Sequence, residues 1–183
     1  MKKVFLAAAV MSALASTSVF ADTITINGEM IEEGCIIGDN GGSEITLDKI
    51  TAKQVKDVAV GGELLNQADS FKISNCPNYD VRIEFSAQTP TGYPDAIVNT
   101  DTPSGEFVAH YLRDGRTVDH KSLTNLASKR VYLANDEAIA AQTVTGFQFP
   151  VLTGYTKIKE VGTGESPVGT TTSTVNLSIT YVQ

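Results

Sequence analysis

Hydrophobic and polar residues alternate along most of the chain beyond residue 21. The pattern is strongest near the carboxyl terminus, where Val175, Leu177, Ile179 and Tyr181 alternate with polar residues. Strict alternation over a short run predicts a strand with one buried face and one solvated face. Further strands are expected at residues 24–26, 45–47, 71–73, 81–85, 107–112, 131–133 and 147–151.

Clusters of turn-forming residues separate these predicted strands. Glycine, proline, asparagine and aspartate gather at residues 38–42, 89–95, 101–106 and 162–167. Residues 48–59 have the apolar spacing of a short amphipathic helix. Because helices and strands do not alternate, a parallel sheet is not expected. Many short antiparallel strands favour a single β-sandwich domain.

The first 21 residues have the pattern of a secretory signal peptide. Lys2 and Lys3 precede a short apolar run at residues 4–15, and the small-residue pattern places the cleavage site after Ala21. A transmembrane anchor is the alternative, but this apolar run is too short to span a bilayer. We therefore expect an exported protein whose mature chain begins at Asp22.

Composition and charge narrow the classes of function. The 183 residues are 42% hydrophobic and 19% charged, which is typical of a globular domain and excludes coiled coils, collagen-like repeats and disordered tails. The net charge is −7, from 14 basic and 21 acidic residues. A nucleic-acid binder usually has the opposite balance, so no nucleic-acid partner is expected.

The two cysteines, Cys35 and Cys76, are predicted to form a disulfide. Exported proteins fold in an oxidising environment, and an even pair of cysteines in such a domain usually closes on itself. Free thiols or bridges to other chains are the alternatives. The predicted bridge closes a loop of about 42 residues and would stabilise the fold by about 4 kcal/mol.

The sequence offers few residues of the kinds that catalysis requires. The two histidines, His110 and His120, stand alone, and no HExxH, GxSxG, phosphate-binding or dinucleotide-binding motif occurs. Residues 38–42 lack the spaced carboxylates of a calcium loop, and the carboxylate pairs at 32–33 and 136–137 have no recognisable partner. We therefore predict no catalytic residues, no cofactor, no metal site and no enzymatic activity.

The segment that opens the mature chain is unusual, because its strand-like pattern begins without a preceding linker. One face presents Ile24, Ile26, Gly28 and Met30, and the other face is polar. The segment is either an ordinary strand of a closed sandwich or a strand that completes the open sheet of another molecule. In the second case, backbone hydrogen bonds would give affinity and alternate side chains would fill pockets.

The order of motifs along the mature chain resembles that of pilins of the chaperone–usher pathway, close to the minor or adaptor subunits of type 1 fimbriae. The matching motifs are ADTITINGEMIEEGC at 21–35, ITL after the first cysteine, FKISNCP around Cys76, VRIEFSA at 81–87 and the terminal VNLSITYVQ. Residues 90–145 match only in general character.

This resemblance implies an all-β fold, namely an incomplete immunoglobulin-like β-sandwich completed by a donor strand from another subunit. It divides the chain into a signal peptide (1–21), an N-terminal donor-strand extension (22–34) and a pilin domain (35–183).

The resemblance also assigns roles to the two ends of the mature chain. Ile24, Ile26 and Met30 would fill pockets of a neighbouring subunit, and Gly28 would lie where the groove leaves no room for a side chain. The terminal strand would border the acceptor groove and bind the chaperone through Val175, Leu177, Ile179 and Tyr181.

The implied function is that of a structural subunit of an adhesive fimbria, which polymerises by donor-strand exchange and contributes to bacterial adhesion. Its partners would be a periplasmic pilus chaperone, an outer-membrane usher, neighbouring pilin subunits and a host receptor reached through the assembled pilus. It would be exported through the periplasm to the cell surface. The alternative is a single-domain adhesin that binds a host glycan or protein, with Tyr93, Tyr111 and Tyr155 as candidate contacts.

Overall fold

The computed structural model describes residues 22–28, 34–39, 41–78, 80–102, 104–124 and 130–182. The signal peptide predicted at residues 1–21 lies outside them. Within the described residues, no helix has the length and apolar character needed to cross a membrane. The elements are β1 (Asp22–Gly28), β2 (Ile36–Ile37), β3 (Gly42–Leu47), α1 (Ala52–Asp57), β4 (Gln67–Ser74), β5 (Asp80–Ala87), a 3-10 turn (Ser104–Glu106), β6 (Val108–Asp114), β7 (Arg130–Tyr132), α2 (Asn135–Ala141), β8 (Phe147–Lys157) and β9 (Thr171–Val182).

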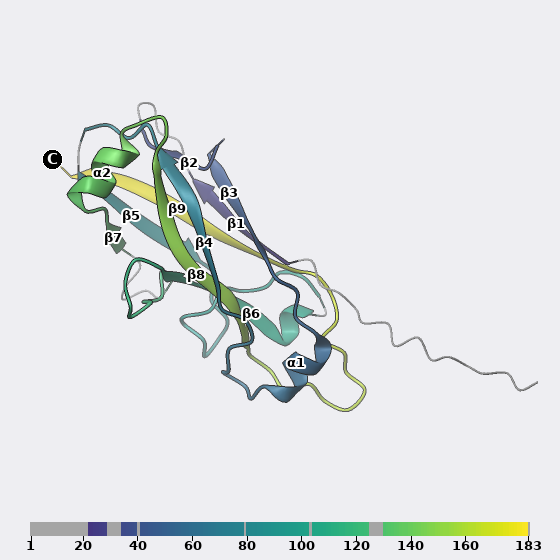
Figure 1. The fold of residues 1–183 in the computed structure, drawn as a ribbon. Coiled ribbons are helices and arrows are strands. Elements are labelled where there is room, and N and C mark those ends of the chain that lie inside the picture. Colours follow the sequence, from purple (N-terminus) through teal and green to yellow (C-terminus); the bar gives the residue numbers. More distant parts are fainter. Residues whose placement is uncertain are drawn as a thin grey trace, which may run out of the picture.

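The strands form two sheets that pack face to face as a sandwich (Figure 1). One sheet has the strand order β3-β1-β9-β5-β7, and the other has the order β2-β4-β8-β6. Neighbouring strands are antiparallel except β1 and β9, which run parallel. The predicted all-β sandwich is confirmed, and the parallel β1–β9 pair is a departure from the antiparallel arrangement that the sequence predicts.

Aromatic side chains from both sheets meet in the core. The rings of Phe71 on β4 and Phe149 on β8 stack with centroids 5.0 Å apart, and Phe85 on β5 lies 5.9 Å from Phe149. All three are fully buried. Because each belongs to the inward set of an alternating strand, the period-two pattern of the sequence places them in one cluster that joins the two sheets.

Helix α1 confirms the short helix expected within residues 48–59. Thr51 precedes its first turn and forms a capping box with Gln54, in which each side chain accepts from the backbone N–H of the other. Val55 is its buried residue and packs into the hydrophobic core. The helix covers the end of the sandwich that lies opposite α2 (Figure 1).

Helix α2 and the two-residue strand β2 are not predicted by the pattern. The α2 segment has no long apolar stripe, and a charged group fixes it instead. Arg116 donates to Glu137 of α2 at 2.8 Å and to Asp114 at 2.9 Å, and its guanidinium lies 4.7 Å from the ring of Phe149. Glu137 also accepts from the Ala134 N–H at the start of the helix. An ion pair that is remote in sequence therefore holds a helix that its own sequence specifies weakly.

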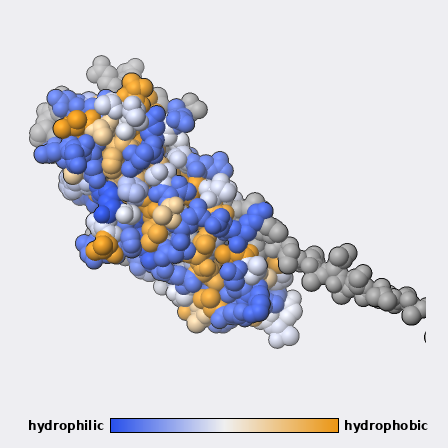
Figure 2. Space-filling view, in the orientation of Figure 1, coloured by the Kyte–Doolittle hydropathy of each residue, from blue (hydrophilic) through white to orange (hydrophobic). Residues whose placement is uncertain are grey.

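The visible surface has no single large apolar face. In Figure 2 hydrophobic residues form small groups interrupted by hydrophilic ones. The large apolar side chains that are exposed include Ile139 and Val144 near α2 and Tyr132 on β7. Scattered exposed apolar residues are normal on soluble domains and mark no site by themselves.

Candidate functional site: the β3–β9 groove

Strand β1 fills a position that no other described segment supplies. It lies between β3 and β9 and is hydrogen-bonded to both. In the order of the sheet, β3 is joined to the other strands only through β1. Without β1, a gap one strand wide would leave the facing edges of β3 and β9 unpaired. We call this gap the β3–β9 groove.

The inward face of β1 fills the groove with apolar side chains. Ile24 and Ile26 are both 0% exposed. Ile24 is the register partner of Ile45 on β3, and Ile26 is the register partner of Val175 on β9. Burying each isoleucine contributes about 1.5–3 kcal/mol relative to leaving it in water. Strand β1 is therefore part of the core of this structure.

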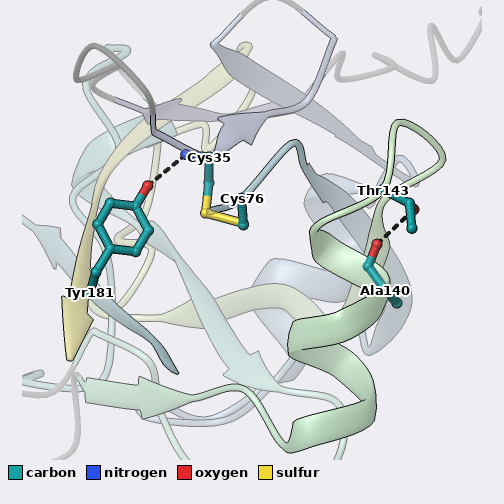
Figure 3. The surroundings of a disulfide bond; sticks show 5 residues. All are labelled: Cys35, Cys76, Ala140, Thr143 and Tyr181. Carbon is teal, nitrogen blue, oxygen red and sulfur yellow. Dashed lines mark hydrogen bonds between the residues drawn. A yellow bond between two sulfur atoms is a disulfide. The ribbon is translucent and has the colours of Figure 1, made fainter. Parts of the chain in front are cut away.

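The direction of β1 agrees with the position of Cys35, the next disulfide residue in the sequence. The strand runs parallel to β9, from Asp22 beside Thr171 to Gly28 beside Leu177. Further along the sequence, Cys35 donates its N–H to the hydroxyl of Tyr181 at 2.6 Å (Figure 3). Cys35 thus lies at the carboxyl end of β9. The carboxyl ends of β1 and β9 therefore point toward the end of the molecule where Cys35 lies.

The Cys35–Cys76 disulfide is confirmed, and it fixes this same end of the molecule. Among the described residues no free cysteine remains. The Cys76 N–H donates to the carbonyl of Ala141 at 2.9 Å, and the turn after α2 is closed by a hydrogen bond from Thr143 to Ala140 (Figure 3). The disulfide and this hydrogen bond therefore connect Cys35 to the carboxyl end of α2.

The opposite end of the groove has a polar floor. His110 on β6 is 0% exposed, and its Nδ1 and Nε2 lie 2.6 Å from the Ser173 hydroxyl and 2.9 Å from the Thr171 hydroxyl. Ser173 donates to the Val98 carbonyl at 2.7 Å, so it accepts from Nδ1–H, and Nε2 accepts from Thr171. This is the pattern of a neutral imidazole protonated on Nδ1, the form that the lowered pKa favours near neutral pH. Burial lowers the pKa of His110 to about 3, and the charge of Asp101 opposes the shift.

The structure brings two groups of sequence-predicted residues together within one chain. Ile24 and Ile26 of the predicted extension lie beside the terminal strand, where Val175 and Leu177 are buried. Gly28 is beside Leu177, and Met30 lies outside the described residues. Two further residues of the terminal strand are partly buried and pack against the core, namely Ile179 and Tyr181.

Sequence reasoning misses the His110 cluster. The pattern predicts an isolated strand or surface histidine, but His110 is buried between the sheets. The signal is present in part, because Thr171 and Ser173 stand at the inward positions of a strand whose later inward residues are apolar. Nothing in the local pattern indicates that a histidine from another strand meets them.

The described residues contain no constellation with evident chemical reactivity. Among them, no three His, Cys, Asp or Glu side chains group as metal ligands do. The His110–Ser173 pair has the residue types of a nucleophile and its base, but both side chains are 0% exposed. Because the Ser173 hydroxyl donates to a backbone carbonyl, the pair has neither access to a substrate nor a free nucleophile.

A small pocket of about 210 Å³ lies beside the loop at residues 89–96. Its lining includes Tyr93, Tyr111, Arg113 and Glu63. Arg113 donates to Glu63 at 2.5 Å and its guanidinium stacks 4.5 Å from the centre of the Tyr111 ring. The third tyrosine predicted as a candidate contact, Tyr155, is 0% exposed and lies away from this pocket, with its hydroxyl donating to the Asp48 carbonyl.

No family model matches this chain, and no curated protein matches it. A solved structure of a chaperone-usher pilus, described as revealing the molecular basis of rod uncoiling, has a similar fold with a TM-score of 0.50. The two chains are 14% identical, and the match covers 85% of this chain and 92% of that chain. At this identity the likeness concerns the fold. The chain therefore has the immunoglobulin-like sandwich found in a chaperone-usher pilus.

Proposed function

We propose that this chain is a structural subunit of an adhesive fimbria that polymerises by donor-strand exchange. The observation that carries the proposal is the strand order β3-β1-β9, in which β1 is the described strand that pairs with both facing edges of the groove. Such a strand is replaceable by an equivalent strand from another copy, because its hydrogen bonds are made by backbone atoms and its side chains only need to fit the groove. The similar fold of a chaperone-usher pilus structure supports the same class of function.

In the proposed assembly, β1 leaves its own groove and enters that of the next subunit. The tether leaves at Cys35, at the carboxyl end of β9. If subunits stack head to tail, this end meets the Thr171 end of the neighbour's groove, and the entering strand runs antiparallel to β9. A head-to-tail contact of this kind does not close on itself and generates a filament. The direction of β1 relative to β9 would thus differ between the monomer and the fibre.

The proposal includes the route by which a subunit reaches the fibre. The signal peptide predicted at residues 1–21 supports export into the periplasm. There, a pilus chaperone would occupy the groove beside Val175 and Leu177 until an outer-membrane usher passes the subunit to its neighbour. The finished fimbrium at the cell surface would contribute to adhesion through a host receptor. Affinity purification from periplasm followed by mass spectrometry tests for the chaperone, the usher and neighbouring subunits.

A pair of matched variants tests strand donation directly. Ile24→Asp with Ile26→Asp places two charges on the inward face of β1, whereas Thr23→Asp with Thr25→Asp places the same charges on its outward face. The mature chains are refolded at high concentration with the disulfide intact, and assembly is measured by light scattering and electron microscopy. We expect fibres from the wild type and from the threonine variant. The isoleucine variant should form none, because its strand no longer fits any groove.

The isoleucine variant should also terminate growth when it is mixed with the wild type, since it still accepts a strand but donates none. Shorter fibres at increasing proportions of this variant are therefore expected. Fibres of unchanged length and yield from the isoleucine variant alone would contradict donation by β1.

A second candidate function is that of a single-domain adhesin, and the pocket beside Tyr93 is the observation that favours it. An aromatic ring next to paired charges, Arg113 and Glu63, suits a saccharide with both apolar and hydroxyl faces. Glycan-array binding by the mature chain, lost in Tyr93→Ala, would support this function. Binding that is absent from both proteins would leave the structural subunit as the only candidate.

A further inference from the structure

The outward faces of β1 and β9 carry the same residues in the same register. Thr23 lies beside Thr172, Thr25 beside Thr174, and Asn27 beside Asn176. The two strands therefore share the pattern Thr-x-Thr-x-Asn, aligned in parallel without an offset. Threonine pairs and ladders of identical amides are favourable neighbours across strands. The outward face of the groove thus fits the chain's own strand in the parallel direction.

The inward faces fit less well in this parallel register. Ile24 stands beside Ser173, whose hydroxyl belongs to the buried polar cluster around His110. Gly28, which has no side chain, stands beside the buried Leu177. The apolar Ile24 is thus next to a polar residue, and the apolar Leu177 has a glycine beside it. Only Ile26 beside Val175 pairs apolar with apolar.

If β1 is reversed while Ile26 stays beside Val175, the inward residues of β1 gain better-matched neighbours on β9. Counting outward from that pair in the antiparallel direction places Ile24 beside Leu177 and Gly28 beside Ser173. Each isoleucine then has an apolar neighbour, and the residue without a side chain lies over the polar cluster. The outward face loses its identical pairs, because Thr25 then lies beside Asn176 and Asn27 beside Thr174.

We propose that the two faces of β1 specify two states. The outward Thr-x-Thr-x-Asn face selects the parallel, self-inserted strand of the monomer. The inward face selects the antiparallel strand of the fibre, in the register that keeps Ile26 beside Val175. This inference rests on the proposed function, since only an assembled neighbour presents its groove in the reversed direction.

Cysteine pairs on the outward face, where Thr25 is half-buried and Thr174 and Asn176 are exposed, test the register without disturbing the core. Thr25→Cys with Thr174→Cys places two thiols side by side in the parallel monomer. Thr25→Cys with Asn176→Cys places them side by side only in the proposed antiparallel fibre. In the parallel monomer that second pair is diagonal, about 7–8 Å apart, which is too far for a disulfide. Thr25→Cys with Thr180→Cys is the control, because β1 does not reach Thr180.

The mature proteins, with the native disulfide intact, are refolded at low and high concentration, oxidised mildly and separated on non-reducing gels. At low concentration we expect the 25–174 pair to give an internally linked monomer and the 25–176 pair to give none. At high concentration the 25–176 pair should give a covalent ladder of oligomers. The control pair should remain unlinked at both concentrations.

Three results would overturn the inference, and they are distinguishable. A ladder formed through the 25–174 pair, with none through 25–176, would show that the fibre uses another register. Monomers that link through 25–176 would contradict the parallel self-inserted strand. If light scattering detects no oligomers of the unsubstituted chain at any concentration, the proposed self-assembly fails, and the fibre register fails with it.

Discussion

Acidification should destabilise this protein through His110, and replacing that histidine should remove part of the effect. The imidazole is 0% exposed between the sheets, where burial keeps it neutral, and its two nitrogens lie within hydrogen-bonding distance of the Ser173 and Thr171 hydroxyls. The variant His110→Gln keeps a polar side chain that can donate to one hydroxyl and accept from the other. It does not titrate, so a comparison with the wild type isolates the contribution of the imidazole.

The sign and size of this loss of stability follow from the pKa of His110 in the unfolded chain and in the folded protein. Burial lowers the pKa of His110 from 6.5 to about 3 in the folded protein. Between these values the unfolded chain binds the proton and the folded chain does not, so stability is lost as the pH falls from about 6.5 toward about 3. At 1.36 kcal/mol per pH unit, the loss attributable to His110 at pH 5 is about 2 kcal/mol. Above pH 7 the histidine adds almost no pH dependence to the free energy of unfolding, because it is mostly neutral in the folded and in the unfolded chain.

The assay is urea unfolding followed by circular dichroism at pH 7.5 and pH 5.0. Other groups also titrate in this range, so the quantity of interest is the difference between the two proteins. The free energy of unfolding of the wild type should fall by about 2 kcal/mol more than that of His110→Gln. Equal losses in the two proteins would refute the buried neutral imidazole. His120→Gln serves as a control, because His120 is partly exposed in a loop.

Three further substitutions should reveal which contacts hold the sandwich together, each measured by urea unfolding at pH 7.5. Cys76→Ser opens the disulfide loop and should cost about 4 kcal/mol, and the loss should disappear when both proteins are compared under reducing conditions. Gly154→Ala should cost about 1–3 kcal/mol or more, because a Cβ there would lie 1.9 Å from the Leu65 carbonyl oxygen. Arg116→Ala should cost about 3 kcal/mol, since it leaves Glu137 without its partner, and a loss below 1 kcal/mol would show that α2 is held by other contacts.

The longer strands of this fold are predictable because each alternates over a length that one pattern covers. Residues 81–85 and 175–181 are examples, and both belong to the central part of the larger sheet. The short helix within residues 48–59 is also predictable, since Thr51 and Gln54 form its capping box locally. In each case the information lies within a few residues of the element it specifies.

What the sequence does not provide depends on contacts between distant segments. Helix α2 is fixed by Arg116, which is 21 residues from Glu137. The polar cluster at the groove unites His110 with Ser173, 63 residues away. The direction of β1 is equally hidden, because an alternating strand shows the same period whichever way it runs. The sequence therefore predicts the strand itself, but it leaves open whether that strand belongs to its own sandwich or to another molecule, and it does not predict the parallel direction.

If the proposed fibre forms, the choice between the monomer and the fibre depends on concentration as well as on fit. In the proposal both states bury Ile24 and Ile26 and pair the edges of β3 and β9, so their contact energies would be similar in kind. A strand tethered by residues 29–34 is presented to its own groove at an effective concentration on the order of millimolar, which a separate subunit reaches only when it is held nearby. Self-insertion should therefore dominate in dilute solution even if the antiparallel register fits the interior better. In the proposed pathway, a chaperone that keeps the groove occupied until a neighbour is in place would remove this kinetic advantage.

Adding excess synthetic peptide of residues 22–30 to the isolated mature monomer should accordingly displace β1 only slowly. Rapid displacement at micromolar peptide would show that the tether gives β1 no such advantage.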